Sequence, residues 1–411
     1  MRGILGICGS PTTAAAAAAS CPSDGSSRLL RLLASTALAL ACGGWAGCAQ
    51  APPPRPESLF HDAWFEARAP VPDTAALLAL SEPMRHFLRS ESGLQPRAAQ
   101  RERALLEALQ RDGKLRLEYD GSRTRTAAQA FEARAGNCLS LVLMTAALAR
   151  EMNLQVTFQL VEADLQWSRR GALLLGSQHV NLRLGAAASA DRRLLVQHEL
   201  IVDFLPPEDL QRRRVQPIDE ARVLAMYLNN RAAEHLADGR LDDAYAHARA
   251  ALRADPGHIP AYRTLGVTYG RRGARAEAVA TLEAARRLAP ADLATLSNLV
   301  VALRRQGDLA RADAMAAELA RLEPDPPLAA YERGLAALGE GNAAAAVNHF
   351  ERELQRNPDQ PEVHHALAIA LFRLGEREAS RRHLAEAEQL GTSPEARRRY
   401  AAKLEWLRQL P

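Results

Sequence analysis

The chain has 411 residues, of which 47% are hydrophobic and 24% are charged, and its formal net charge at pH 7 is +4. This length accommodates two or three domains with buried cores. Acidic and basic residues are interleaved, which argues against the concentrated Lys/Arg face or arm of a nucleic-acid-binding protein.

Residues 1–48 have the pattern of an export signal. Arg28 and Arg31 precede the apolar stretch "LLASTALALACGGWAGC", which ends in small residues ahead of Cys48. The stretch is too short to span a membrane as a helix. We therefore expect export, with residues 1–48 acting as a signal peptide.

The sequence "AGC" at the end of this stretch resembles the end of a bacterial lipoprotein signal, with Trp45 where such signals usually have Leu. That resemblance implies a lipid on Cys48 and a periplasm-facing protein anchored in a membrane, most simply the outer membrane. Cys42, after "LA", is a competing site, and "ALA" at 39–41 would serve an ordinary signal peptidase. Residues 49–59, "APPPRPES" and its flanks, are predicted to form an extended tether because proline favours polyproline II.

Several amphipathic helices are predicted at the start of a domain that spans 60–215. The helical patterns cover 81–90, 100–113 and 124–136, and Gly113 and Gly136 are expected to end the last two. Asn137 is then expected to cap a new helix through its side-chain oxygen. That helix, "CLSLVLMTAALAREMNL", is apolar on nearly every face and is predicted to be buried.

Cys138 is the first residue of this buried helix and the only cysteine after Cys48. A lipid on Cys48 would leave Cys138 without a disulfide partner, and an unpaired cysteine in an exported protein is a candidate reactive thiol. The helix N-terminus favours negative charge, and the thiolate is the nucleophilic form. The alternative is a small buried hydrophobic side chain.

Three strands with a two-residue period are predicted after the helix, at 154–162, 179–184 and 197–204. The second strand places His179, Asn181 and Arg183 on one face. The third places Asp203 opposite Leu200, Val202 and Phe204. We expect the last two strands to form an antiparallel pair with His179 directly across from Asp203, joined by a connection at 188–194.

A nucleophile, a base and an orienting carboxylate would then come together as Cys138, His179 and Asp203. These residues and the motif "RAGNCLS" resemble the transglutaminase-like superfamily, which implies an α+β papain/transglutaminase-like domain and these three catalytic roles. His198 is an alternative base, although its parity places it on the other face of the third strand. Asn181 stands where that superfamily often has an aromatic residue, and the backbone N–H of Cys138 is the one oxyanion donor that we can name.

Residues 222–392 repeat with a period of 34, which aligns Gly239, Gly273, Gly307, Gly341 and Gly375. Pro256, Pro290, Pro324 and Pro358 have the same spacing. This period and pattern are similar to tetratricopeptide (TPR) repeats, which implies five stacked helix pairs forming an all-α solenoid with a continuous core. Residues 393–411 are predicted to form a capping helix that starts at Ser393.

The concave groove of such an array suits a protein or peptide ligand, and arginines favour an acidic or C-terminal peptide. The positions predicted to line it are Arg263, Arg271, Arg304, Arg305, Arg373, Asn229, Tyr331 and Phe372. The alternative is that these side chains belong to an ordinary solvent-exposed helix surface that binds no ligand.

Two functions are compatible with this organisation. The first is a cell-envelope thiol enzyme, an amide or peptide hydrolase or a transamidase, whose repeats recruit its substrate. The second is an inactive transglutaminase-like/TPR scaffold that binds envelope proteins. The sequence contains no Cys/His cluster with zinc spacing and no phosphate-binding glycine loop, so no metal or nucleotide cofactor is expected.

Overall fold

The computed structural model describes residues 56–90, 101–110, 117–170, 173–186, 200–204, 214–324 and 328–409. Several features predicted from the sequence lie outside the described residues: the signal with Cys42 and Cys48, the tether residues 49–55, the helix end at Gly113, the alternative base His198, and the 188–194 connection. No helix among the described residues is long and apolar enough to cross a membrane.

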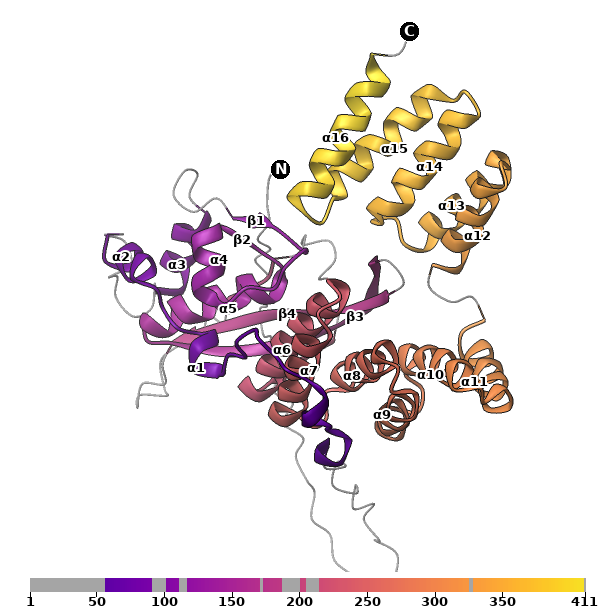
Figure 1. Cartoon of the computed structure of the whole chain (residues 1–411). Helices are drawn as coiled ribbons and strands as arrows, with labels where there is room; N and C mark the ends of the chain where they lie inside the picture. The colour runs from indigo at the N-terminus through magenta and orange to yellow at the C-terminus, as the bar shows by residue number, and fades with distance from the viewer. Residues whose placement is uncertain are drawn as a thin grey trace, which may run out of the picture.

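The first half of the described chain combines short helices with a small antiparallel sheet (Figure 1). Its helical elements are η1 (Pro56–Leu59), η2 (Asp62–Trp64), α1 (Thr74–Leu77), α2 (Glu82–Ser90), α3 (Arg101–Gln110), α4 (Ala127–Ala133) and α5 (Cys138–Glu151). Its strands are β1 (Glu118–Tyr119), β2 (Ala135–Gly136), β3 (Leu154–Arg170), β4 (Leu173–Ala186), β5 (Leu200–Val202) and β6 (Arg214–Ile218).

Helix α5 is the centre of this half. Eleven consecutive residues, 139–149, are buried, as the uniformly apolar sequence predicts. They share one hydrophobic cluster with the apolar face of the sheet, which includes Phe158, Leu182 and Val202. This packing fixes the start of α5, and therefore Cys138, relative to the strands.

The sheet has the strand order β5-β4-β3-β6, and all of its pairs are antiparallel. The predicted pairing of the second and third strands is present, but the predicted register is wrong by two residues. Leu182 lies opposite Val202. One residue further along the same register, Asn181 and not His179 is opposite Asp203. The hairpin of β3 and β4 is also much longer than the predicted strands, and β6 was not predicted.

The second half is the helical array, with α6 (Glu220–Ala237) as its first helix. The other helices are α7 (Leu241–Ala254), α8 (Ile259–Arg272), α9 (Arg275–Leu288), α10 (Leu293–Gln306), α11 (Leu309–Leu322), α12 (Ala329–Gly339), α13 (Ala343–Arg356), α14 (Pro361–Arg373), α15 (Arg377–Leu390) and α16 (Pro394–Arg408). All five register glycines have positive φ, between 77° and 94°, at the turn inside each helix pair. This conformation costs glycine little because it has no Cβ.

The capping helix α16 forms as predicted. The Ser393 side chain accepts a hydrogen bond from the N–H of Ala396 at 3.1 Å, and Pro394 occupies the first turn. Tyr400, Leu404 and Leu407 are buried on one face of the helix. They cover the apolar edge of the last repeat.

The core of the array is interrupted between α11 and α12, contrary to the predicted continuous solenoid. No hydrophobic cluster of the described residues has members on both sides of this link. Helix α11 buries only Ala312, and α12 begins only at Ala329, after a link that contains Pro324, Pro326 and Pro327. Proline disfavours helix at the preceding residue, so the start of α12 is delayed relative to the other repeats.

Residues 56–70, which we call the N-terminal strap, lie against the first two repeats. The Tyr245 hydroxyl donates to Asp62 Oδ1 at 2.6 Å and accepts from the N–H of His61 at 2.9 Å. The Phe65 ring stacks on Tyr245 with ring centroids 3.9 Å apart. The predicted extended tether, 49–59, therefore ends in the 3-10 helix η1, and the chain after residue 60 first follows the repeats before it enters the α+β half.

Candidate functional site

Cys138 lies at the N-terminus of α5 and is half-buried. Asn137 caps the helix as predicted: its Oδ1 accepts from the N–H of Ser140 at 2.9 Å and from the Ser140 hydroxyl at 2.7 Å. The first backbone N–H groups of a helix have no intrahelical partner. Those of Cys138 and Leu139 are therefore donors for an anion at the sulfur.

Gly136 has a different role from the one predicted. Helix α4 ends at Ala133, and Arg134 adopts the left-handed conformation there, with φ 50°. Gly136 instead belongs to β2 and pairs with Tyr119. A Cβ at Gly136 would lie 2.6 Å from the Cβ of Ser140, so the close approach of β2 to α5 requires glycine.

The structure brings His179 and Asp203 together. His179 Nε2 is hydrogen-bonded to Asp203 Oδ1 at 2.7 Å, and both side chains are buried. Because the register differs by two residues from the predicted one, His179 and Asp203 are diagonal neighbours on adjacent strands. A histidine side chain is long enough to bridge the distance between such positions. Asn181, directly opposite Asp203, donates from Nδ2 to Asp203 Oδ2 at 2.9 Å. Asn181 thus holds the second oxygen of the carboxylate that His179 uses.

Cys138 is the third member of this group. Its thiol lies close enough to His179 that its interaction raises the pKa of the ring. The structure therefore assembles the three predicted residues from α5, β4 and the end of β5.

The protonation of His179 follows from its two partners. Burial by itself lowers the pKa of the ring, but the hydrogen bonds and negative charges of Asp203 and Cys138 raise it, to about 9. At neutral pH His179 is therefore the imidazolium, and both ring nitrogens donate. An imidazolium beside the sulfur is the partner that a thiolate nucleophile requires.

A short segment that the sequence did not single out forms the other wall of the site. Tyr119 pairs with Gly136 in the β1–β2 ladder, one residue from the cap. Burial and the charges of Cys138 and Asp120 raise the pKa of the Tyr119 hydroxyl, so it is neutral and can donate a hydrogen bond. The Asp120 carboxylate pairs with Arg125 at 2.9 Å. This part of the site could not be predicted, because the sequence around Tyr119 and Asp120 has no helical or strand periodicity.

The predicted groove arginines divide into two groups. Arg271 and Arg373, at equivalent repeat positions, donate to the carbonyls of Leu236 and Leu338 at 2.6 and 2.7 Å. They bond the ends of helices in the preceding repeat. Arg263 pairs with Asp292 at 3.0 Å. Arg304 and Arg305 are exposed, and Arg304 pairs with Asp313 at 3.6 Å.

The other predicted groove residues are also engaged. Asn229 accepts from the Thr264 hydroxyl at 2.8 Å, and the rings of Tyr331 and Phe372 contact Phe350 and Trp406. Exposed apolar side chains at one repeat position were not predicted: Val301 and Leu335, which are 34 residues apart, are 49% and 37% exposed. Val267 and Ile369 occupy the same repeat position and are partly buried.

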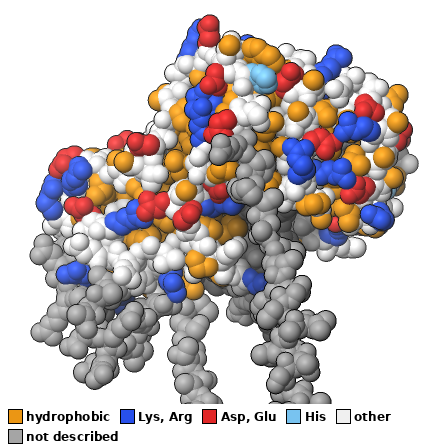
Figure 2. Space-filling view, turned by 90° about the horizontal axis from the view of Figure 1, so that it is seen from below, with side chains coloured by type: hydrophobic (Ala, Val, Ile, Leu, Met, Phe, Trp, Pro, Cys, Tyr) orange, Lys and Arg blue, Asp and Glu red, His pale blue; other side chains and the backbone are white. Residues whose placement is uncertain are grey.

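Charges on the face shown in Figure 2 are mixed. Lys/Arg and Asp/Glu side chains alternate over that face, and no area of one sign dominates it. Among the described residues, no group of three or more His, Cys, Asp or Glu side chains could hold a metal ion.

Comparison with known proteins identifies the repeats. A tetratricopeptide-repeat family model matches residues 337–403, so the C-terminal region contains TPR repeats. No curated protein matches the chain. The matched residues lie in the last repeats and in α16, and the half with Cys138 is outside them.

Solved structures that resemble the chain are TPR proteins with low similarity. MamA is 22% identical over 40% of this chain and 95% of its own, with a TM-score of 0.23. YrrB, described as a TPR protein with an unusual peptide-binding site, is 20% identical over 44% of this chain and 92% of its own, with a TM-score of 0.24. A thermophilic TPR protein of Thermus thermophilus is 23% identical over 44% of this chain and 99% of its own, with a TM-score of 0.30.

Proposed function

We propose that the protein is an exported, membrane-anchored thiol enzyme of the transglutaminase-like type, with a TPR array that binds its protein or peptide substrate. The observation that carries this proposal is the grouping of Cys138, His179 and Asp203, in which His179 Nε2 lies 2.7 Å from Asp203 Oδ1 and the charge of Cys138 acts on the ring. Export, the lipid on Cys48 and the outer-membrane location remain inferences from the sequence of residues 1–48.

The proposed reaction is acyl transfer from an amide. The Cys138 sulfur attacks the carbonyl carbon, and the N–H groups of Cys138 and Leu139 donate to the resulting oxyanion. The leaving amine takes a proton from His179 as the C–N bond breaks, which leaves a thioester on Cys138. Water or a second amine then attacks the thioester while His179 accepts its proton, and the thiolate is released. Asp203, held by Asn181, orients the ring throughout.

The repeats would recruit the substrate. The exposed aliphatic side chains of Val301 and Leu335, with exposed Arg305 one helical turn from Val301, favour a segment with apolar side chains and some negative charge.

A second function, a non-catalytic scaffold, is favoured by one observation. The family match lies in the repeats, whose known role in other proteins is binding. In this alternative the Cys138 site in the α+β half is catalytically inactive, and the function of the protein is binding by the repeat array.

The pH profile of Cys138 alkylation separates the two functions. An enzyme should react with iodoacetamide almost as fast at pH 6 as at pH 8, whereas an ordinary thiol slows roughly a hundredfold between these values. His179→Ala should restore the ordinary profile. The tryptic peptide 135–150 contains Cys138 as its only cysteine, so mass spectrometry of this peptide measures the alkylation of Cys138 in the full chain. A wild-type profile that matches an ordinary thiol contradicts the enzyme and leaves the scaffold.

The membrane anchor has a separate test. Cys48→Ala should leave a soluble exported protein, and Cys42→Ala should change nothing. Fractionation of the host cells with detergent extraction reports both variants. Retention of the Cys48→Ala protein in the membrane contradicts a lipid on Cys48.

A further inference from the structure

Residues 118–125, which we call the coupling segment, connect Cys138 to the repeat array. The segment begins with β1, which pairs with β2 immediately before Asn137, and it ends where α4 starts. Both ends of the array contact it, although they lie more than 100 and 250 residues away in sequence.

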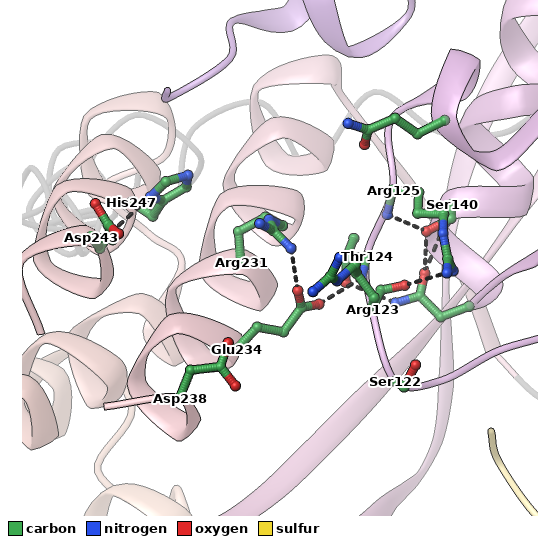
Figure 3. A network of polar contacts seen from close by, with 12 residues as sticks. Ser122, Arg123, Thr124, Arg125, Ser140, Arg231, Glu234, Asp238, Asp243 and His247 are labelled. Carbon is green, nitrogen blue, oxygen red and sulfur yellow. Dashed lines mark hydrogen bonds and ion pairs between the residues drawn. The ribbon is translucent and has the colours of Figure 1, made fainter. Parts of the chain in front are cut away.

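One contact comes from the first repeat. The Glu234 carboxylate on α6 accepts from the N–H of Thr124 at 2.6 Å. The Thr124 hydroxyl oxygen accepts from Asn137 Nδ2 at 2.8 Å. Figure 3 shows Glu234 directed at Thr124, with Arg231 on its other side. A continuous path therefore runs from the carboxylate through Thr124 to the cap of the helix that begins at Cys138.

The cap is held from the same segment a second time. The N–H of Arg125 donates to the Ser140 hydroxyl at 2.8 Å, and that hydroxyl donates to Asn137 Oδ1. With the Nδ2 contact to Thr124, both polar atoms of the Asn137 side chain are fixed. The position of the cap therefore depends on the position of Thr124 and Arg125.

The second contact comes from the far end of the array. The carbonyl of Thr392, in the turn before α16, accepts from the N–H of Gly121 at 2.6 Å. Arg397 donates to the Tyr119 carbonyl at 3.3 Å and to the Gly391 carbonyl at 2.7 Å. In Figure 1 the array leaves the sheet at α6 and returns so that α16 lies beside β1 and β2.

We propose that the repeat array positions Cys138 through the coupling segment, with Glu234 and Thr124 as the positioning residues that act through Asn137. This inference rests on the proposed function, because it assigns the control of the same thiol. A carboxylate that accepts from both the Thr124 N–H and Arg231 is held at both oxygens, and a charged acceptor makes each hydrogen bond stronger than a neutral one. The first repeat is thus part of the site, and the contact at Thr392 steadies the opposite end of the segment.

Thr124→Val and Thr124→Ser test the path in the full chain. Valine keeps the size of the side chain but removes the oxygen that Asn137 uses, while serine keeps that oxygen. We expect Cys138 alkylation at pH 6 to slow about fivefold to tenfold in Thr124→Val. Without its hydrogen bond to Thr124, Asn137 holds the N-terminus of α5 less firmly, and the helix then stabilises the Cys138 thiolate less well. Thr124→Ser should restore the wild-type rate.

Glu234→Gln tests the other end of the path, with Glu405→Gln on the exposed face of α16 as the matched control. Glu234→Gln should lower the same rate, and the double variant with Thr124→Val should be no slower than either single variant, because both act on one cap. Additive losses, or a Glu234→Gln rate equal to that of the control, overturn the proposal.

Hydrogen exchange separates this inference from the proposed function. Amides of 118–141 should exchange faster in Thr124→Val and Glu234→Gln, whatever the reactivity of the thiol. If wild-type Cys138 behaves as an ordinary thiol but this exchange increases, the enzyme is wrong and the coupling stands. If Cys138 is activated and neither its rate nor the exchange changes in the variants, the coupling is wrong and the enzyme stands.

Discussion

At the scale of single residues, the site depends on one buried histidine with two acidic neighbours. His179 and Asn181 hydrogen-bond the two oxygens of Asp203, and the charge of Cys138 acts on the His179 ring. Burial penalises the charged ring, and the two partners more than offset that penalty. The imidazolium is therefore part of the folded structure and contributes to its stability.

This contribution gives a pH-dependent stability that His179→Gln should remove. The folded pKa of His179 is about 9, above its value of 6.5 in an unfolded chain. The stabilisation is therefore fully present below pH 6.5 and is lost as the pH rises through about 9. We expect His179→Gln to lower the free energy of unfolding by on the order of 3 kcal/mol at pH 6 and by much less at pH 10.

Urea unfolding at the two pH values, followed by circular dichroism, measures this difference. His365→Gln is a suitable control, because burial and the nearby Lys403 lower the pKa of His365 to about 4, so its ring is neutral in the folded protein at both pH values and the effect of its substitution should not decrease from pH 6 to pH 10. A His179→Gln effect that is equal at both pH values would show that the ring is neutral in the folded protein.

The members of this site could be predicted from the sequence, but their geometry could not. Strand parity placed His179 and Asp203 on one face, and the apolar run after Cys138 identified a buried helix. The register required the length and path of the connection between the strands, which parity does not determine. The role of Gly136 could not be predicted, because it depends on the close approach of β2 to Ser140 on α5. In the sequence alone, a glycine just before an N-cap residue is equally consistent with the end of the preceding helix.

At the scale of elements, the N-terminal strap joins the first two repeats to the start of the chain. Its contacts include the ring stack of Phe65 on Tyr245 and the hydrogen bonds of Arg68 and Ala69 N–H groups to Asp243 Oδ1, both 2.8 Å. Arg272 lies over the other side of Phe65, with 4.4 Å to the ring centroid. The proline-rich composition at the start of this segment predicts an extended tether, but it does not show that the chain is bound to the repeats.

Tyr245→Phe should loosen the strap and leave the repeats folded. The change keeps the ring that stacks on Phe65 but removes the hydroxyl that bonds Asp62 and His61, at a cost of about 1–2 kcal/mol. Trypsin should then cleave after Arg68 faster than in the wild type.

Tyr262→Phe is the matched control for this experiment. Its hydroxyl donates to the Pro256 carbonyl at 3.0 Å, within the array, so its loss should not expose Arg68. Equal cleavage of the two variants would mean that the strap is held by its apolar contacts alone.

The repeats were the elements best predicted from the sequence, because glycine, proline and apolar positions reinforce one another in every unit. The strands β1, β2 and β6 were missed for the opposite reason. The two-residue strands β1 and β2 are too short to show a period, and β6 contains Pro217, which is tolerated only because the strand is at the edge of the sheet.

At the scale of the whole molecule, the boundaries of the hydrophobic cores differ from those of the repeats. One cluster includes Leu141 of α5, Tyr245 of α7 and Leu265 of α8, so the α+β half and the first two repeats share a core. Another cluster, around Phe350 and Leu367, is confined to α12–α14. The sequence period predicts an even series of units, but the packing divides the chain between α11 and α12.

This division predicts that α6–α9 keep their structure when α12–α16 lose theirs. Phe350 is fully buried and lies against Gly334, so Phe350→Ala should cost α12–α16 about 3–5 kcal/mol. Since stability in a repeat array passes only between neighbours in contact, α6–α9 should keep their protection from hydrogen exchange. Leu265→Ala, in the shared core, should instead reduce the protection of both α8 and α5. Equal loss of protection in α6–α9 and α12–α16 after Phe350→Ala would show that the link between α11 and α12 transmits stability, as in an uninterrupted solenoid.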